Sequence, residues 1–452
     1  MNHIPSPKYH IILKKKFAIC FKFPVTLLAA LLMFTSCSTY KTVNRSFENS
    51  NAFRQGFSGL AVYDPETGKM LYEHNAEKYF TPASNIKLFS LYTGLKILGD
   101  SVPALEYFYN NDTLVFSGTG DPSFLNPDLP DSGVLKFLKD TKAPLAYLPP
   151  ATEEKIFGPG WAWDDYNSYY SVERTPLPIY GNRVSFQQKK GNEEVNVFPG
   201  SFKDSLVTET PAIGSQSWIK RDQAKNRFVF YPYQNPGTLN QDVPFKYSTE
   251  LLVQLLSDTL QKEVLIFKGA VPASAEKNKL YSIHVDSMYK RMMEVSDNFI
   301  AEQILLLASK TISDTLSTGI AIKHMKENFL KDLPDEVYWV DGSGLSRYNL
   351  VTPRSMIKLL SKIEKEVPRE RLFNMLATGG KSGTLKNSYI AERPYIFAKT
   401  GTLRNNHSLS GYLRAKSGKI LIFSFMNSNY TVPTSEIRTQ MELILRDFYE
   451  TN

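Results

Sequence analysis

The chain has 452 residues, of which 42% are hydrophobic and 13% aromatic, a length and composition that predict two or three folded domains and exclude a largely disordered protein. Its formal charge of +8 would suit a nucleic-acid partner, but five lysines and no acidic residue fall within the first 36 positions. The charge of +8 less these five lysines leaves +3 on the other 416 residues, so no nucleic-acid partner is predicted.

The first 36 residues have the layout of an export signal. A basic stretch ends at Lys22, and an apolar run of 12 residues, 23–34, follows it. Twelve helical residues span about 18 Å, which is too short for the roughly 30 Å hydrocarbon core of a membrane. The ending Thr35-Ser36-Cys37 resembles a bacterial lipobox, so we expect lipidation of Cys37, export to the periplasm and a membrane anchor. The alternative is an ordinary signal peptide in which this cysteine occurs by chance.

The predicted folded body contains no cysteine, because Cys20 and Cys37 are the only two in the chain. A disulfide framework and a cysteine-ligated metal are therefore excluded there. The six histidines show no spacing typical of metal ligands. We predict a protein that uses neither a metal nor a cofactor.

Residues 37–56 are polar and lack apolar periodicity, which predicts a tether. Order is expected from Phe57, where apolar residues 60–63 and 70–72 flank a turn and predict two strands. A helix with leucines at helical spacing is then predicted from Ser84 to Leu98. Residues 57–100 would form the first part of the main domain.

Residues 101–280 differ in texture, with short β-like runs and many Pro, Gly, Asn and Tyr residues. They predict a mostly β insertion, of one piece or of two nested pieces, in which 251–260 is the one clear helical segment. The main domain then resumes over 281–452. Its predicted elements are helices at 288–309 and 318–330, a strand hairpin at 407–415 and 420–426, and a last helix at 436–448 that packs on the sheet.

The first motif with chemical content is Ser84-Asn85-Ile86-Lys87. Residues three apart share a helix face, so the Lys87 amine can reach the Ser84 hydroxyl, and a helix N-terminus favours negative charge on that oxygen. A serine is a poor nucleophile until a base accepts its proton. Lys87 can be that base only if burial or a nearby cation lowers its pKa, and Lys399 is the expected cation. Taken alone, the motif equally fits a helix-start serine beside a surface lysine.

The second motif is Ser296-Asp297-Asn298. Residues two apart diverge on a regular helix, so Ser296 and Asn298 can face one cleft only if the segment is a turn between two helices. Ser296 would then shuttle a proton from Lys87 to the leaving amine, and Asn298 would bind the substrate backbone. The structural alternative is that Ser296 or Asp297 caps the helix that follows, and both readings can hold together.

The third motif, Lys399-Thr400-Gly401-Thr402, follows an apolar strand pattern. Lys399 and the hydroxyls of Thr400 and Thr402 can bind a terminal carboxylate, Gly401 would let a substrate backbone approach, and the N–H groups of Thr402 and Ser84 could form an oxyanion hole. A second candidate, Lys381-Ser382-Gly383-Thr384, lies in a glycine-rich stretch without a preceding strand. This segment resembles a P-loop, but position 375, where that motif requires glycine, is Met, so nucleotide binding is not predicted.

Together and in this order, the three motifs are the set shared by penicillin-binding proteins and class A β-lactamases. With further matching segments between residues 57 and 448, such as Gly118–Pro122, Gly160–Asp165 and Asp341–Ser346, the chain resembles the large-insert D-alanyl-D-alanine carboxypeptidases, or class C penicillin-binding proteins. The 212 residues between Ser84 and Ser296 exceed the interval in class A β-lactamases and require an insertion.

The resemblance implies an α/β (α+β) fold, with a penicillin-recognising, transpeptidase-like antiparallel sheet flanked by helices and split by the insertion. It also implies a serine carboxypeptidase that acts on peptidoglycan peptides and is acylated by β-lactams; the same machinery serves endopeptidases. Two alternatives remain open. One is a wall-binding or β-lactam-sensing lipoprotein that turns over little substrate, and the other is a β-lactamase.

Overall fold

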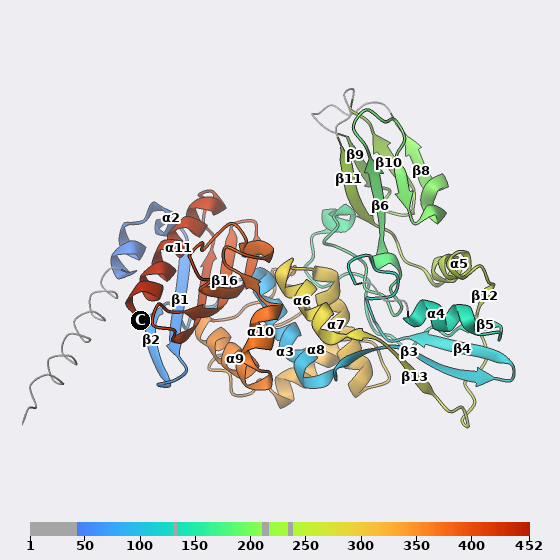
Figure 1. The fold of residues 1–452 in the computed structure, drawn as a ribbon, viewed down its shortest axis with the longest axis horizontal. Helices are drawn as coiled ribbons and strands as arrows, with labels where there is room; N and C mark the ends of the chain where they lie inside the picture. Colours follow the sequence, from blue (N-terminus) through green and yellow to red (C-terminus); the bar gives the residue numbers. More distant parts are fainter. Residues whose placement is uncertain (1–42, 130–132, 210–216, 234–237) are drawn as a thin grey trace, which may run out of the picture.

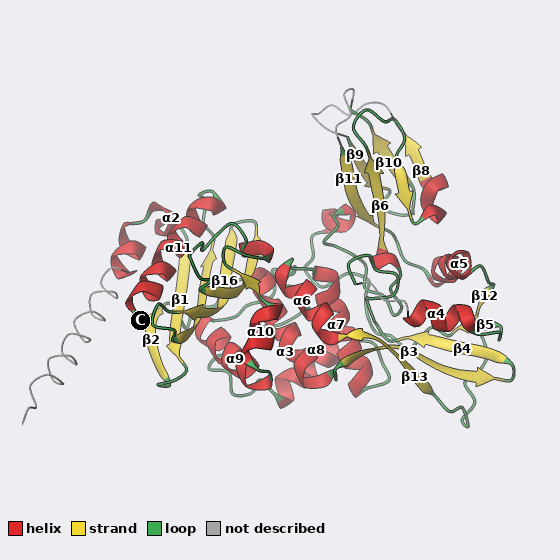
Figure 2. Ribbon diagram, viewed as in Figure 1, coloured by secondary structure: helices red, strands yellow, loops and turns green. Residues whose placement is uncertain are grey.

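The structure is a computed structural model that describes residues 43–129, 133–209, 217–233 and 238–452. A six-stranded sheet lies at one end, a block of helices lies in the middle, and two further β parts lie at the other end (Figures 1 and 2). The predicted export signal and Cys37 lie outside the described residues.

The six-stranded sheet joins segments from both ends of the chain, in the order β14-β15-β16-β17-β1-β2. All of its strand pairs are antiparallel. The bounds are β1 Phe57–Asp64, β2 Lys69–His74, β14 Ala377–Thr378, β15 Ile396–Leu403, β16 Asn406–Arg414 and β17 Ile420–Ser428. The predicted hairpin is therefore β16 and β17, and β1 completes the sheet beside β17.

Helices cover both faces of this sheet, which confirms the predicted fold class. Side chains alternate between the faces of a strand, so Leu60 and Val62 of β1 pack toward α11 (Thr434–Thr451), whereas Ala61 packs toward the central helices. On α11, the predicted apolar face is buried against the sheet. Because both faces are covered, β17 is buried along its whole length.

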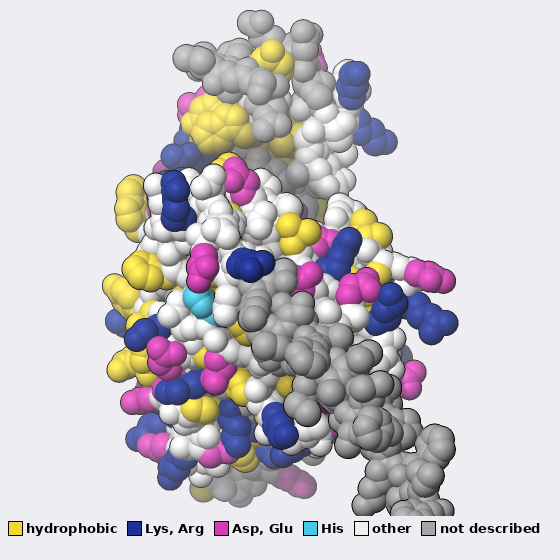
Figure 3. Space-filling view, turned by 90° about the vertical axis from the view of Figure 1, so that its left-hand side faces the viewer, with side chains coloured by type: hydrophobic (Ala, Val, Ile, Leu, Met, Phe, Trp, Pro, Cys, Tyr) yellow, Lys and Arg dark blue, Asp and Glu magenta, His cyan; other side chains and the backbone are white. Residues whose placement is uncertain are grey.

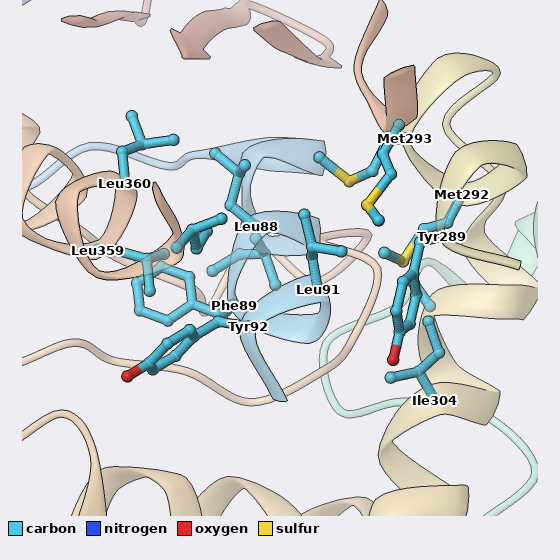
Figure 4. Close-up of a cluster of buried hydrophobic side chains, with 14 of the residues drawn as sticks. Leu88, Phe89, Leu91, Tyr92, Tyr289, Met292, Met293, Ile304, Leu359 and Leu360 are labelled. Atoms are coloured by element: carbon cyan, nitrogen blue, oxygen red, sulfur yellow. The ribbon is translucent and has the colours of Figure 1, made fainter. Parts of the chain in front are cut away.

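The central block is a cluster of helices around α3 (Lys87–Ile97). Its other members are α6 Val285–Glu294, α7 Asn298–Ile312, α8 Thr318–Asn328, α9 Pro353–Glu366 and α10 Arg369–Met375. Figure 4 shows Leu88, Phe89 and Leu91 of α3 between side chains of α9 on one side and of α6 and α7 on the other. This packing fixes the N-terminal end of α3, where the first motif lies.

Residues 101–284 form two β parts. The first is a five-stranded sheet, in the order β12-β5-β4-β3-β13, with α4 and α5 against one face. Its elements are β3 Ser101–Asn110, β4 Thr113–Gly118, α4 Gly133–Asp140, β5 Leu145–Tyr147, α5 Thr249–Leu260, β12 Val264–Ile266 and β13 Asn278–His284. Helix α5 matches the predicted segment, but α4 was missed because its eight residues are flanked by turn-forming ones.

The second β part is nested within the first along the chain. It holds two three-stranded sheets, in the orders β8-β10-β9 and β11-β6-β7. Their bounds are β6 Arg183–Gln188, β7 Asn196–Phe198, β8 Leu206–Thr208, β9 Trp218–Arg221, β10 Phe228–Tyr231 and β11 Leu239–Pro244. Strand β13 crosses residue 280, the predicted end of the insertion.

The prediction of a polar tether over residues 37–56 is wrong for residues 43–56, the part that the structure describes. Residues 43–49 are helical, and a short helix, α2 (Asn51–Arg54), follows. Val43, Phe47 and Phe53 are buried in the same cluster as α11. These few apolar residues are too sparse for a periodic pattern, yet each finds a partner on the sheet end of the molecule.

Charged side chains of both signs are interspersed on this sheet-bearing end, rather than gathered into a patch of one sign (Figure 3). The described part of the chain contains no helix with the length and apolarity that a bilayer span requires.

Candidate active site

Ser84 lies in a 3₁₀ turn, η1 (Ala83–Ile86), which leads directly into α3. The predicted helix start is therefore a tighter turn. Because a 3₁₀ helix has three residues per turn, residues i and i+3 eclipse, and the Nζ atom of Lys87 lies 2.9 Å from the Oγ atom of Ser84. The turn begins at Ala83, whose φ of 48° is in the left-handed region that non-glycine residues rarely occupy.

Two glycines allow other segments to approach this turn closely. A Cβ atom on Gly344 would lie 1.9 Å from the carbonyl oxygen of Ala83, and one on Gly401 would lie 2.4 Å from that of Pro82. Asn85 adds a hydrogen bond, since its Nδ2 donates to the carbonyl oxygen of Lys399 at 2.9 Å. The space where a side chain of Gly401 would lie is occupied by the turn that carries Ser84. That Gly401 also admits a substrate backbone stays a prediction.

The amine of Lys87 is buried and has three hydrogen-bond partners. Its Nζ lies 2.9 Å from Ser84 Oγ, 2.6 Å from Asn298 Oδ1 and 2.6 Å from the carbonyl oxygen of Ser343. An ammonium group would donate to all three. A free amine has two donors and one lone pair, so it would donate to Asn298 and Ser343 and accept the hydroxyl proton of Ser84. The neutral form is thus arranged as a base for Ser84.

Burial lowers the pKa of Lys87 to about 8, against the opposing effect of the carboxylates of Asp341, Glu302 and Asp297. Burial also lowers the pKa of Lys399 well below its ordinary value, and the charge of Lys87 adds to that shift. Of the two causes that the sequence suggested for a lowered pKa of Lys87, burial is confirmed, and the charge of Lys399 is not among the causes. Removal from water is the dominant effect at both amines.

The second motif occupies the break between α6 and α7. Ser296 has a φ of 66°, which turns the chain sharply between the two helices, as expected. Asp297 is the N-cap of α7 and accepts from the backbone N–H of Ile300 at 3.1 Å. Asn298 points at Lys87 and donates from Nδ2 to the carbonyl oxygen of Tyr170 at 3.0 Å. Capping and site geometry coexist, as the sequence allowed.

The third motif forms the C-terminal half of β15. The Nζ atom of Lys399 is buried and donates to Ser296 Oγ at 2.8 Å and to the carbonyl oxygen of Thr400 at 2.7 Å. Thr402 Oγ1 lies 2.8 Å from Nδ1 of His407, whose pKa burial lowers to about 3. His407 is therefore neutral at physiological pH.

The three motifs border one cleft of about 1240 Å³. Its lining includes Ser84, Ser296, Asn298, Thr400 and Thr402, whereas Lys87 and Lys399 lie beneath its floor. On the outer side of β15, strand β14 pairs only with Phe397 and Ala398. Beyond them, β15 continues along the cleft, so an extended peptide could lie beside Lys399–Leu403.

Several residues at the site had no role in the sequence interpretation. The second candidate motif contributes Thr384, whose Oγ1 accepts from Thr400 Oγ1 at 2.7 Å. The turn 341–346, known only as a matching segment, supplies the carbonyl of Ser343 to Lys87. Glu302 is buried within α7 and accepts from the backbone N–H of Ser343 at 2.8 Å. An acidic residue inside an apolar helix was the available signal.

The sequence pattern of one known family matches nearly the whole chain. It is the D-Ala-D-Ala carboxypeptidase 3 (S13) family, and the match covers residues 40–448. Two curated relatives align along most of their own length. The chain is 24% identical to a D-alanyl-D-alanine carboxypeptidase of Actinomadura sp. (strain R39), over 84% of this chain and 79% of that one. It is 22% identical to D-alanyl-D-alanine carboxypeptidase DacB of Haemophilus influenzae, over 92% and 95%.

Among solved structures, the fold is similar to that of penicillin binding protein 4 (dacB) from Haemophilus influenzae. The TM-score is 0.73 with 18% sequence identity, and the match covers 90% of this chain and 99% of the other. A second structure of that protein, complexed with a β-lactam, gives a TM-score of 0.68 with 17% identity, over 91% and 99%. The inserted parts are therefore included in the shared fold.

Proposed function

This chain belongs to the D-Ala-D-Ala carboxypeptidase 3 (S13) family, and we propose that Ser84 is the nucleophile, Lys87 the base, Ser296 the proton shuttle and Lys399 the carboxylate anchor of its reaction. The family and its D-alanyl-D-alanine carboxypeptidase relatives identify the chain as a serine-type D-Ala-D-Ala carboxypeptidase that binds penicillin. Its substrates are peptides of peptidoglycan, and β-lactams are its covalent inhibitors.

In the first step, Ser84 Oγ forms a bond to the carbonyl carbon between the two D-Ala residues, and its proton passes to the free amine of Lys87. The N–H groups of Ser84 and Thr402 stabilise the oxyanion. The C–N bond then breaks and the electron pair stays on the nitrogen. A proton relayed from Lys87 through Ser296 completes the departing amine.

The carboxylate of the leaving D-Ala binds at Lys399 and at the hydroxyls of Thr400 and Thr402. An anion at this position favours the charged form of Lys399, so binding restores the proton that burial disfavours. Asn298 can also contact the substrate, since an amide nitrogen carries two donors. Water then adds to the acyl-enzyme, the ester bond to Ser84 breaks, and the shortened peptide leaves as a carboxylate.

One observation carries this proposal: the buried amine of Lys87 lies 2.9 Å from Ser84 Oγ, and its other two partners lie 2.6 Å away. These partners use the donors of a neutral amine and leave its lone pair for the serine proton. A surface lysine beside a helix-start serine would have neither this burial nor these partners.

A fluorescent penicillin tests the nucleophile. Wild type should acquire a lasting label, Ser84→Ala should acquire none, and Ser201→Ala, an exposed serine of the second β part, should be labelled like wild type. Mass analysis of D-Ala-D-Ala peptides should show release of one D-Ala by wild type only. An unlabelled wild type, or a labelled Ser84→Ala, contradicts the proposal. A label without peptide cleavage would indicate a non-hydrolytic binder, and rapid loss of label a β-lactamase.

We also propose that the protein is exported to the periplasm and anchored through lipidated Cys37. Val43, six residues after Cys37, is buried against the sheet-bearing end, and six residues span at most about 21 Å. Lipidation would thus hold the sheet-bearing end close to a membrane, with two or three acyl chains needed for durable anchoring. In fractionated cells, the penicillin-labelled band should lie in the membrane fraction for wild type and in the soluble fraction for Cys37→Ser. A membrane-bound Cys37→Ser contradicts the anchor.

A further inference from the structure

Three charged side chains that have no part in the reaction steps above are buried beneath the cleft. Asp341 and Glu302 are fully buried, and Arg174 is 4% exposed. Asp341 belongs to the turn 341–346, Glu302 to α7, and Arg174 to the segment between β5 and β6. Buried carboxylates are costly unless hydrogen bonds or cations compensate them, so each needs a structural explanation.

Asp341 holds its turn together by accepting four hydrogen bonds. Its Oδ1 accepts from the N–H of Gly344 at 2.9 Å and from Asn349 Nδ2 at 2.7 Å. Its Oδ2 accepts from the N–H of Ser346 at 2.7 Å and from Nε1 of Trp161 at 2.9 Å. Three of these donors are close in sequence. Trp161 is 180 residues away, in the predicted insertion.

The turn that Asp341 organises touches both catalytic residues of the first motif. The carbonyl of Ser343 accepts from Lys87 Nζ at 2.6 Å, and Gly344 packs against the backbone of Ala83, next to Ser84. Glu302 holds the same turn through the N–H of Ser343 at 2.8 Å. A shift of this turn would therefore move a hydrogen-bond partner of the base and the support of the nucleophile.

The predicted insertion contacts this turn through Trp161, and through Arg174 it contacts Glu302, which supports the turn. Trp161 bonds to Asp341, and Arg174 Nη1 lies 3.3 Å from Glu302 Oε2. The Arg174 guanidinium also lies over the Trp161 ring, 5.6 Å from its centroid, and pairs with Glu154 at 2.7 Å. Trp161, Arg174 and Glu154 therefore form one connected group of side chains from the predicted insertion.

We propose that Trp161 and Asp341 are positioning residues for Lys87. The indole N–H of Trp161 holds Asp341, Asp341 holds the turn 341–346, and the turn holds the Ser343 carbonyl on the catalytic amine. The insertion thereby acts on the chemistry as well as on the shape of the cleft. This inference rests on the proposed role of Lys87 as base.

The arrangement requires an ionised Asp341, because a protonated carboxyl cannot accept all four bonds. The pKa of Asp341 is raised to about 6, because burial and the charge of Glu302 raise it by more than the bonds from Ser346, Trp161 and Asn349 lower it. Lys87 and Arg174 are the cations of this group, and Lys87 also faces Lys399 and Asp297. Below about pH 6, the carboxylate of Asp341 and the amine of Lys87 would both be protonated.

The test is the pH dependence of the acylation rate with a fluorescent penicillin, on the whole protein. In wild type, the logarithm of the rate should rise with a slope of about 1 between pH 6 and 8, where Lys87 but not Asp341 loses its proton, and with a slope of about 2 below pH 6, where both do. Trp161→Phe keeps an aromatic side chain but removes the N–H donor, which raises the pKa of Asp341. The steeper part should then begin about one pH unit higher.

Trp163→Phe is the matched control, because Trp163 is 77% exposed and lies two residues from Trp161. Its profile should match wild type, with circular dichroism confirming that all variants are folded at each pH. An unmoved break in Trp161→Phe, an equal loss of rate at every pH, or a wild type without the steeper part would each overturn the inference. These results differ from failure of the proposed function, in which wild type is not acylated or Ser84→Ala still is.

Discussion

The six-stranded sheet and the junction beneath the cleft are both buried, but their side chains differ in kind. The sheet and its helices bury two large clusters of apolar side chains, with members such as Leu91, Phe423 and Leu445. At the junction of α3, α7 and the turn 341–346, five charged side chains are buried instead: Lys87, Lys399, Asp341, Glu302 and Arg174.

The apolar clusters account for stability, whereas the buried charges account for reactivity. Apolar burial stabilises the fold by about 25 cal/mol for each Å² removed from water, whereas buried charges contribute little net stability even when they are paired. Their removal from water does change their chemistry, as the lowered pKa of Lys87 shows. The sheet therefore supplies a rigid support, and the junction supplies an amine that can lose its proton near neutral pH.

The largest effect is expected when Lys87, the proposed base, is removed from the junction. Lys87→Met keeps an unbranched side chain of similar length but cannot accept the proton of Ser84. The acylation rate at pH 9 should fall by about 10³-fold, in the range for loss of a general base. Stopped-flow measurement with a fluorescent penicillin checks this. A loss of less than tenfold would show that another group takes the proton.

The next effect lies in the apolar region. Leu91→Ala removes a fully buried side chain of α3, and we expect the free energy of unfolding to fall by about 2–5 kcal/mol. Urea denaturation measures this change. Leu443→Ala, at a position of α11 that is 53% exposed, should cost less than about 0.5 kcal/mol. Equal losses in the two variants would contradict the assignment of stability to this core.

The smallest effect is the pH response of the wild-type junction. Lys87 in the folded protein has a pKa of about 8, below its ordinary 10.5, so it gains a proton as the pH falls through 8. The base is then lost, and the acylation rate should fall about tenfold for each pH unit between 8 and 6. A rate that stays constant from pH 9 to 7 would show that the amine is already neutral throughout this range.

Much of the site was predictable because its polar residues fall in three short sequence motifs. The Ser84 and Lys87 pair needs only one turn of helix, and Asp297 caps the helix that begins beside it. Strand β15 could be expected from the apolar residues before Lys399. The alternating residues at 407–415 and 420–426, with a turn between them, likewise predicted the hairpin of β16 and β17.

Other features escaped because their signals are distributed. The first described helical segment, 43–49, has too few apolar residues to show a period, and α4 is too short to stand out between turns. The role of Gly401 depends on Pro82, which approaches from another element. Trp161 and Asp341 are 180 residues apart, and neither lies in a motif that names the other.

The sequence by itself determined which chemical groups this protein has and the local spacing of the first two of them, because residues within one turn meet whatever the rest of the chain does. Only the tertiary structure decided that Ser296, Asn298 and Lys399 meet that pair. It also decided that Lys87 lies away from water, near three carboxylates and a second amine. Burial and long-range contacts belong to the packed chain as a whole, and burial is what lowers the pKa of Lys87 to about 8.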